Sequence, residues 1–258
     1  MFDIARITGS GLAGHLDYHD SIGSTSDRAL ELAAQDLAPL PLLVLAERQT
    51  GGRGRGTNRW WSAEGALTFS LALETTSARL GPQHWPRLSL VAGLAVCESL
   101  ESLAPHAEWR VKWPNDVFVN GGKICGVLAE SVPGWRDRLV VGIGINVNNS
   151  LAAAPEEIRQ SARALCDLGA HSHDLTEVLL TVLDRLDLRL RDLAADGFHS
   201  LADAYRSRCL LAGKTVTVRV GSQTIVGVCR GIDPDGILLV ATETGIERIV
   251  SGSIDSWE

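Results

Sequence analysis

The pattern of apolar residues changes near Leu210, and this change constrains the fold more than any other feature of the sequence. Before it, apolar runs of strand length alternate with stretches of helical periodicity, such as the leucine-rich face of 175–193. After it, short β-rich runs separated by turns lie at 215–220, 224–230, 236–241 and 247–250. The sequence therefore predicts a mixed α/β part over 1–210 and a compact all-β barrel or sandwich over 211–258.

Turn and capping residues place the elements of the first part. Residues 23–27 are rich in N-cap types and precede a helical pattern, so residues 24–26 are expected in the loop that opens a helix. Asp174 and Glu177 have capping-box spacing at the start of the leucine-rich helix. The Asn-Gly-Gly at 120–122 indicates a hairpin. Strands are expected at 42–47, 66–73, 110–113, 123–130 and 139–147, and a buried helix over 85–103.

Charge and cysteine content argue against several classes of protein. The 24 basic and 31 acidic residues give a net charge of −7, which argues against a general nucleic-acid binder. No apolar run reaches about eighteen residues and no secretory signal is present, so neither a membrane span nor export is expected. The five cysteines form no CxxC pair, and the histidines show no ligand spacing with them. We therefore expect a cytoplasmic protein with reduced thiols and no protein-built metal site.

The segment GGRGRGTNRWW, residues 51–61, combines positive charge with flexible backbone. Its glycines let backbone N–H groups approach an anion, and Arg53 and Arg55 add donors that suit carboxylate or phosphate. It contains neither standard phosphate motif, and the GxGxxG match at 9–14 lacks a clear helical pattern behind it, so we interpret that match as chance. A solvated hairpin and an RNA-binding segment stay open as alternatives, although RNA-binding segments of this kind occur in disordered tracts.

A second motif, VKWPNDVFVNGGKICGVLAE at 111–130, concentrates unusual residue types around a turn. Pro114 stops or bends the strand, and Asn115 and Asp116 follow where polar side chains can fix the backbone. Lys123 follows the hairpin, a place where a lysine is usually a surface charge. The density of unusual residues distinguishes the motif from such a surface.

A third motif, GIGINVN at 142–148, is a strand pattern interrupted by Gly142 and Gly144. Glycines within a strand mark the close approach of a ligand or of another backbone, and the sequence leaves both possibilities open. Asn146 is a polar residue on an otherwise apolar segment and needs a hydrogen-bond partner.

Together these motifs resemble the biotin protein ligase family. The matching blocks, in order, are Gly23-Ser24-Thr25, AERQTGGRGRG with Trp60, KWPNDV with GKICGVLAE, and GIGINVN. The resemblance implies a mixed sheet flanked by helices, like the catalytic fold of class II aminoacyl-tRNA synthetases and biotin ligases, with a small C-terminal SH3-like β-barrel. It also implies a two-step reaction. Biotin and MgATP give biotinyl-5′-adenylate, and a lysine of a biotin carboxyl carrier domain of acetyl-CoA or a related carboxylase then attacks it.

The resemblance also assigns roles to residues. Lys123 is implied to bridge the biotin carboxylate and the α-phosphate as the principal catalytic residue, while Arg55 offsets negative charge. Asp116 is a candidate for activating the incoming lysine. The other implied ligand-binding residues are Ser24, Thr25, Ser26 and Gln49 for the biotin ring, Arg53 and Gly54 in the loop that closes over the ligand, Trp113 beside the apolar tail, Gly126, Gly142 and Gly144 along the slot, Asn115 with Asp116 at the phosphate and Mg²⁺, and Asn146 near the adenylate.

The sequence departs from the family pattern at three positions. Ser26 stands where the family usually has Asn, which puts that biotin contact in question, although a hydroxyl there can still form a hydrogen bond. Thr57 and Asn58 replace the usual glycine and arginine, a change that bears on the ordering of the loop more than on its chemistry. Neither change touches Arg53, Arg55 or Lys123.

Partners and rival functions complete the expectations. Some family members carry a DNA-binding domain of about 60 residues, whereas 22 residues precede Gly23 here, so we expect no repressor function and no nucleic-acid partner.

A lipoate–protein ligase shares the fold and the adenylation logic, but GRGRG and KWPND favour biotin. A non-enzymatic RNA-binding module is the rival from another class. The oligomeric state stays open, and edge strands are compatible with a homodimer.

Overall fold

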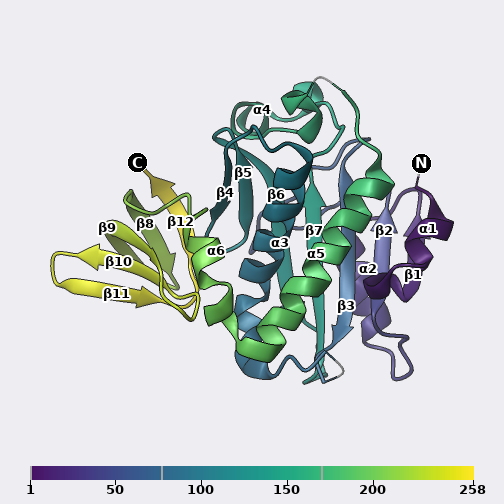
Figure 1. Ribbon diagram of the computed structural model, residues 1–258, viewed down its shortest axis with the longest axis horizontal. Helices are drawn as coiled ribbons and strands as arrows, with labels where there is room; N and C mark the ends of the chain where they lie inside the picture. Colours follow the sequence, from purple (N-terminus) through teal and green to yellow (C-terminus); the bar gives the residue numbers. More distant parts are fainter. Residues whose placement is uncertain (1, 77, 170) are drawn as a thin grey trace.

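Two β-sheets, one of seven strands and one of five, form the framework of the computed structural model (Figure 1). The structure describes residues 2–76, 78–169 and 171–258. The larger sheet has the order β1-β2-β3-β7-β6-β5-β4, in which β1 and β2 are parallel and the other neighbours are antiparallel. Its strands are β1 (His15–His19), β2 (Leu42–Ala46), β3 (Leu67–Glu74), β4 (Trp109–Lys112), β5 (Asp116–Val119), β6 (Gly122–Ser131) and β7 (Arg138–Ile145).

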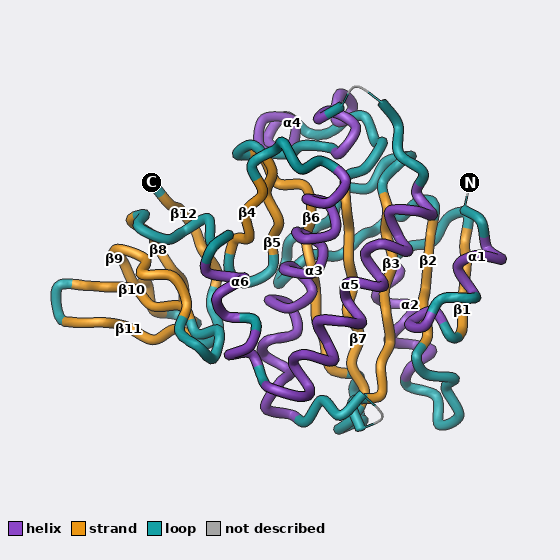
Figure 2. Tube along the Cα trace, viewed as in Figure 1, coloured by secondary structure: helices purple, strands orange, loops and turns teal. Residues whose placement is uncertain are grey.

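Helices cover both faces of the larger sheet, because its central strands are apolar on both sides. Every residue of β2 and β7 is buried. Helices α3 (Leu88–Leu103) and α5 (Leu175–Asp196) lie side by side over one face, and α2 (Thr25–Ala33) packs on the other (Figure 2). The shorter helices are α1 (Ile4–Thr8), α4 (Glu156–Ser161) and α6 (Ala202–Arg206), with 3₁₀ turns η1 (Gly11–Ala13), η2 (Pro82–Arg87), η3 (Leu151–Ala153), η4 (Leu165–Leu168) and η5 (Phe198–Ser200).

The expected helix starts are confirmed in one case and corrected in another. Asp174 caps α5, because its carboxylate accepts the backbone N–H groups of Thr176 and Glu177. Ser24 caps α2 in the same way. The expectation that 24–26 all lie in the preceding loop is wrong, since Thr25 and Ser26 already form the first turn of α2.

The C-terminal sheet is antiparallel throughout and has the order β11-β10-β9-β8-β12. Its strands are β8 (Thr215–Val220), β9 (Gln223–Ile232), β10 (Leu238–Thr242), β11 (Gly245–Ile249) and β12 (Ser253–Trp257). The mixed α/β class and the all-β unit after it are thus confirmed, and β12 is an additional strand that the sequence patterns did not indicate. Over the described residues no pairing joins β11 to β12, so the unit is an open five-stranded sheet rather than a closed barrel.

The C-terminal sheet is fixed against the end of the larger sheet that carries β4 and β5 (Figure 1). Its inner side chains, such as Val216 and Val240, join the same buried cluster as α3 and α5. The Trp113 indole N–H donates to the Gly236 carbonyl (3.4 Å), and the Arg206 Nε–H donates to the Ile232 carbonyl (2.9 Å). Within the described ranges, no helix has the length and hydrophobicity that crossing a bilayer requires.

Arg138 at the start of β7 gives the first testable prediction. Its side chain is buried, stacks on Trp135 and donates to the backbone carbonyls of Ala33, Gln35 and Asp36 at the end of α2. Replacing Arg138 by methionine leaves these carbonyls without their donor, so we expect the free energy of unfolding to fall by about 2–4 kcal/mol.

Urea denaturation measures this loss directly. The matched control is Arg136→Met, because Arg136 is exposed two residues earlier. The control is expected to stay within about 0.5 kcal/mol of the original chain. An Arg138→Met protein as stable as the control would show that water replaces the guanidinium at no cost.

Candidate active site

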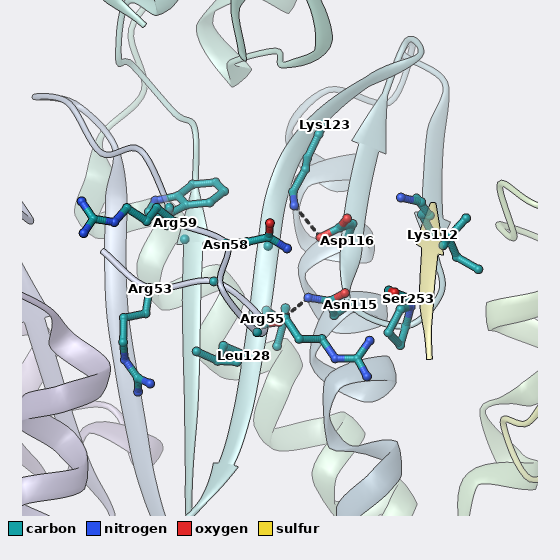
Figure 3. Close-up of a pocket in the computed structure, with 18 of the residues that line it drawn as sticks. Arg53, Arg55, Asn58, Arg59, Lys112, Asn115, Asp116, Lys123, Leu128 and Ser253 are labelled. Atoms are coloured by element: carbon teal, nitrogen blue, oxygen red, sulfur yellow. Dashed lines mark hydrogen bonds and ion pairs between the residues drawn. The ribbon is translucent and has the colours of Figure 1, made fainter. Parts of the chain in front are cut away.

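A cavity of about 1180 Å³ opens between the glycine–arginine loop, the strands β4 to β7 and the C-terminal sheet (Figure 3). This volume accommodates a ligand larger than most drug-sized molecules. Most residues proposed from the sequence line it: Thr25, Ser26, Gln49, Arg53, Gly54, Arg55, Trp113, Asn115, Asp116, Lys123, Gly126, Gly142 and Gly144. The fold therefore brings together segments that are more than 100 residues apart in the chain.

Ser24 and Asn146 are proposed residues that the structure does not bring into the cavity lining. The Ser24 hydroxyl accepts the backbone N–H of Asp27 and so serves as a helix cap. The Asn146 side chain is buried, and its Oδ1 accepts from Asn149 Nδ2 at 3.0 Å. The hydrogen-bond partner expected for Asn146 is therefore present, but it is Asn149, and neither residue lines the cavity.

The end of the cavity beside α2 is a network of neutral polar groups, called the polar end below. Gln49 Oε1 accepts the Thr25 backbone N–H (2.7 Å) and lies 3.1 Å from the Thr25 hydroxyl. Ser70 on β3 is 2.9 Å from Thr25 Oγ1 and 3.1 Å from Ser26 Oγ. Gly142 permits this arrangement, because a Cβ there would lie 2.3 Å from Ser26 Oγ. Hydroxyl and amide groups in this cluster suit a neutral ring that offers both donors and acceptors.

Trp60 lies over the glycines of β6 and β7. Gly126 and Gly144 are paired directly across these strands. A Cβ on Gly144 would be 2.4 Å from Trp60 Cε2, and one on Gly126 would be 3.5 Å from Trp60 Cζ3. Trp60 Nε1 is buried and has no hydrogen-bond acceptor among the described residues. The glycines thus mark a close approach, and in this structure the approaching group is the indole of the loop.

The hairpin of β5 and β6 holds the central charges of the cavity. The Lys123 ammonium is 2.6 Å from Asp116 Oδ1 (Figure 3). Asn115 fixes the corner of the hairpin, because its Nδ2 donates to the Val127 carbonyl (2.8 Å) and its own carbonyl accepts the Val127 N–H (2.9 Å). Lysine and aspartate therefore face the cavity from a rigid support.

The two loop arginines both line the cavity, but they have different surroundings. Arg53 forms a bidentate ion pair with Glu130 and a third contact to Asp27 (2.7 Å), so its charge is already balanced. Arg55 donates to the Gly252 carbonyl and has no carboxylate within ion-pair distance in the described ranges. Burial lowers the pKa of Arg55, and Asp116 opposes that shift. Figure 3 shows the two guanidinium groups pointing apart, and Arg55 is the one available to an anion.

Several residues of the site lay outside the set proposed from the sequence. Ser70 does not line the cavity itself, but it contacts Thr25 and Ser26, which do, and it lies on a strand that the pattern indicated only as apolar. Lys112, at the end of β4, faces the cavity with Phe118 and with Trp257 of β12. Burial lowers the pKa of Lys112, while Asp116 raises it and Lys123 lowers it. Lys112 stands inside the KWPND motif and could have been proposed, whereas nothing in the short run at 253–257 marks Trp257 as part of a site.

Comparison with known proteins identifies relatives across the whole chain. Residues 18–148 match the Biotin/lipoate A/B protein ligase family, and residues 212–257 match the Biotin protein ligase C terminal domain. The chain is 37% identical to a biotin–[acetyl-CoA-carboxylase] ligase of Mycobacterium tuberculosis, over 86% of this chain and 82% of that protein. It is 36% identical to the bifunctional ligase/repressor BirA of Bacillus subtilis, over 93% of this chain and 74% of that protein.

A solved structure of similar fold is that of a biotin protein ligase from Aquifex aeolicus in complex with biotin and ATP. The two superpose with a TM-score of 0.80 at 35% sequence identity. The superposition covers 95% of this chain and 98% of that one. The similarity therefore extends over both sheets.

Proposed function

The chain belongs to the biotin protein ligase family, and we propose how its own residues carry out the reaction of that family. It is a ligase that activates biotin with ATP and transfers it to protein. The assignment of residues rests on one observation: Lys123, Asp116 and Arg55 all line the same cavity. The polar end of that cavity matches the donors and acceptors of a ureido ring.

In the first step, biotin binds with its ring at the polar end and its carboxylate toward Lys123. A carboxylate oxygen forms a bond to the α-phosphorus of ATP, and the bond from that phosphorus to the pyrophosphate oxygen breaks. Two anions have to approach each other, and the ammonium of Lys123 and the guanidinium of Arg55 offset their repulsion. Because Lys123 is paired with Asp116 in this structure, the incoming oxyanions compete with Asp116 for the ammonium.

In the second step, the amine of a carrier lysine attacks the acyl carbon, and AMP leaves. We assign Asp116, the carboxylate paired with Lys123, to take a proton from that amine. The described residues offer no cluster of three or more metal-ligating side chains. If Mg²⁺ arrives on the phosphates of ATP, Asp116 and Asn115 would supply the one or two protein oxygens that Mg²⁺ usually takes.

The remaining assignments are proposals of the same kind. The acceptor is a biotin carboxyl carrier domain of acetyl-CoA or a related carboxylase, as the name of the Mycobacterium relative suggests. The reaction takes place in the cytoplasm, which the five free thiols support. Residues 1–210 form the catalytic domain and 211–258 the C-terminal domain. The absence of repressor function and the possible homodimer stay predictions, and specific, salt-sensitive retention of operator DNA would contradict the first.

Incubation with ATP, biotin and a carrier domain, followed by intact mass measurement, tests the proposed function. We expect the carrier to gain one biotinyl group, and to gain none when its acceptor lysine is replaced. Exchange of labelled pyrophosphate into ATP should depend on biotin and not on lipoate. Exchange that depends on lipoate alone would instead favour a lipoate ligase.

Trp60 provides a direct signal of ligand binding. Its indole occupies the space over Gly144 in which a ligand would lie against the strands, so biotin has to displace it or stack against it. We expect biotin or a stable biotinyl-adenylate analogue to change the tryptophan fluorescence of the protein. Trp60→Phe should remove most of that change, whereas Trp85→Phe, outside the cavity, should leave it. An unaltered signal in Trp60→Phe would show that the indole keeps its place when ligand binds.

A further inference from the structure

The cavity continues beyond Lys123 and Asp116 in two directions of different chemistry. Toward α4 it is lined by Glu157, Ile158 and Ser161. Toward the C-terminal sheet it is lined by Lys112, Trp257 and the ion pair of Arg219 with Asp255, together with the turn at 251–253, and this side is called the C-terminal wall below. Among these lining residues the α4 side offers a carboxylate and no cation, whereas the C-terminal wall offers the Lys112 ammonium, which suits a polyphosphate, and its one carboxylate, Asp255, is paired with Arg219.

Lys112 is directed into the cavity by its strand pairing. It is directly opposite Asp116 in the antiparallel pair of β4 and β5, so the two side chains share one face of the sheet. The Lys112 ammonium is 4.1 Å from the centroid of the Trp257 ring and 6.0 Å from that of Phe118. The two rings meet edge to face, with centroids 6.1 Å apart. The ammonium is therefore held by aromatic groups from both sheets.

These aromatic contacts take the place of a counter-ion. In the part of the chain that the structure describes, no carboxylate lies within ion-pair distance of Lys112. The two aspartates that line the cavity have other partners, because Asp116 pairs with Lys123 and Asp255 pairs with Arg219. A partly buried ammonium is costly unless something compensates it, and the face of a tryptophan does so only in part. Lys112 therefore presents positive charge that an anion in the cavity can use.

The direction of the reaction places such an anion at the C-terminal wall. In phosphoryl chemistry the attacking and leaving oxygens lie roughly in line through phosphorus. The attacking carboxylate comes from the polar end, which lies beside β3, and β7, β6 and β5 separate that strand from β4. Figure 3 likewise shows Lys112 beyond Lys123 and Asp116 as seen from Arg53. The leaving pyrophosphate consequently departs toward Lys112.

We propose that Lys112 binds the β- and γ-phosphates of ATP in the first step, and that Trp257 is a positioning residue that holds Lys112 there. This inference rests on the proposed function. The bond made and the bond broken are those of adenylate formation. Lys112 stabilises the charge that accumulates on the pyrophosphate as it takes up the bonding electron pair. The C-terminal sheet thereby contributes to the site through the placement of a lysine from the other sheet.

Separate assays of the two steps test the role of Lys112. For Lys112→Met we expect about a tenfold or larger rise in the KM for ATP and in the inhibition constant of pyrophosphate. The KM for biotin, and transfer from synthetic biotinyl-5′-adenylate to the carrier, should change by less than about twofold, because neither involves pyrophosphate. The matched control is Lys214→Met, since Lys214 is the lysine that does not line the cavity.

The positioning role of Trp257 is tested in the same assays. Trp257→Leu should raise the KM for ATP, and Trp257→Phe should raise it less, because a phenyl face still attracts a cation. In a protein that already carries Lys112→Met, Trp257→Leu should have no further effect on the KM for ATP. An additive effect in the double variant would overturn the positioning role. Thermal unfolding of each variant separates this outcome from loss of β12, and Trp257→Phe serves where Trp257→Leu does not fold.

The outcome also distinguishes the inference from the function on which it rests. If the unmodified protein shows no biotin-dependent pyrophosphate exchange, the proposed function fails. If it does show exchange and Lys112→Met behaves like Lys214→Met, only the pyrophosphate assignment fails. Slower transfer from preformed adenylate in Lys112→Met would also overturn the assignment, because that step contains no pyrophosphate.

Discussion

Replacing Lys123 by methionine is expected to slow the formation of biotinyl-5′-adenylate by about 10²–10³-fold. Methionine keeps most of the length and apolar character of the side chain but removes the ammonium. Two oxyanions must then meet beside Asp116, which has lost its partner at 2.6 Å. The measurement is biotin-dependent exchange of labelled pyrophosphate into ATP at saturating substrates. Because Lys123 is only partly buried, the variant should fold normally.

Two further variants show where this loss arises. Lys214→Met makes the same chemical change outside the cavity and should leave exchange unaffected. Lys123→Met combined with Asp116→Asn removes both members of the ion pair. If the missing ammonium causes the loss, the double variant stays slow. Recovery to near the original rate would contradict our assignment, because it would mean that repulsion from an unpaired Asp116 had caused the effect.

The motifs predicted the central part of the site because they encode local geometry. The proline and the Asn-Gly turn within 111–130 specify a hairpin, and a hairpin places Asp116 and Lys123 on adjacent strands whatever the rest of the chain does. Gly126 and Gly144 mark a place where backbone is approached closely, and the approaching group is Trp60. For such short-range features, sequence and structure agree.

Features that depend on long-range contacts could not be predicted in this way. Nothing near Arg53 in the sequence indicates Glu130, which lies 77 residues later and neutralises it. Trp257 belongs to a five-residue strand without strong alternation, and its contact with Lys112 exists only because the C-terminal sheet packs on β4 and β5. The sequence could thus supply the residue types of a cation-rich site, while tertiary packing decides which of the cations is free.

This distinction leads to the second large effect, which separates the two loop arginines. Arg55→Met is expected to lower the rate of adenylate formation by about 10²-fold, because it removes a cation that faces the reacting groups without a carboxylate partner. Arg53→Met removes a cation already paired with Glu130 and Asp27. It should loosen the loop and raise the KM for biotin by about tenfold, with kcat changed much less.

Glu130→Gln provides the matched comparison, since it breaks the same anchor from the opposite side. If Arg53 acts by anchoring, Glu130→Gln raises the KM for biotin as Arg53→Met does, and the two changes combined are no worse than either alone. If Arg53 instead contacts the reacting anions, Arg53→Met lowers kcat as Arg55→Met does, while Glu130→Gln leaves kcat intact. The split between KM and kcat therefore shows whether one or both arginines of the GRGR sequence stabilise the transition state.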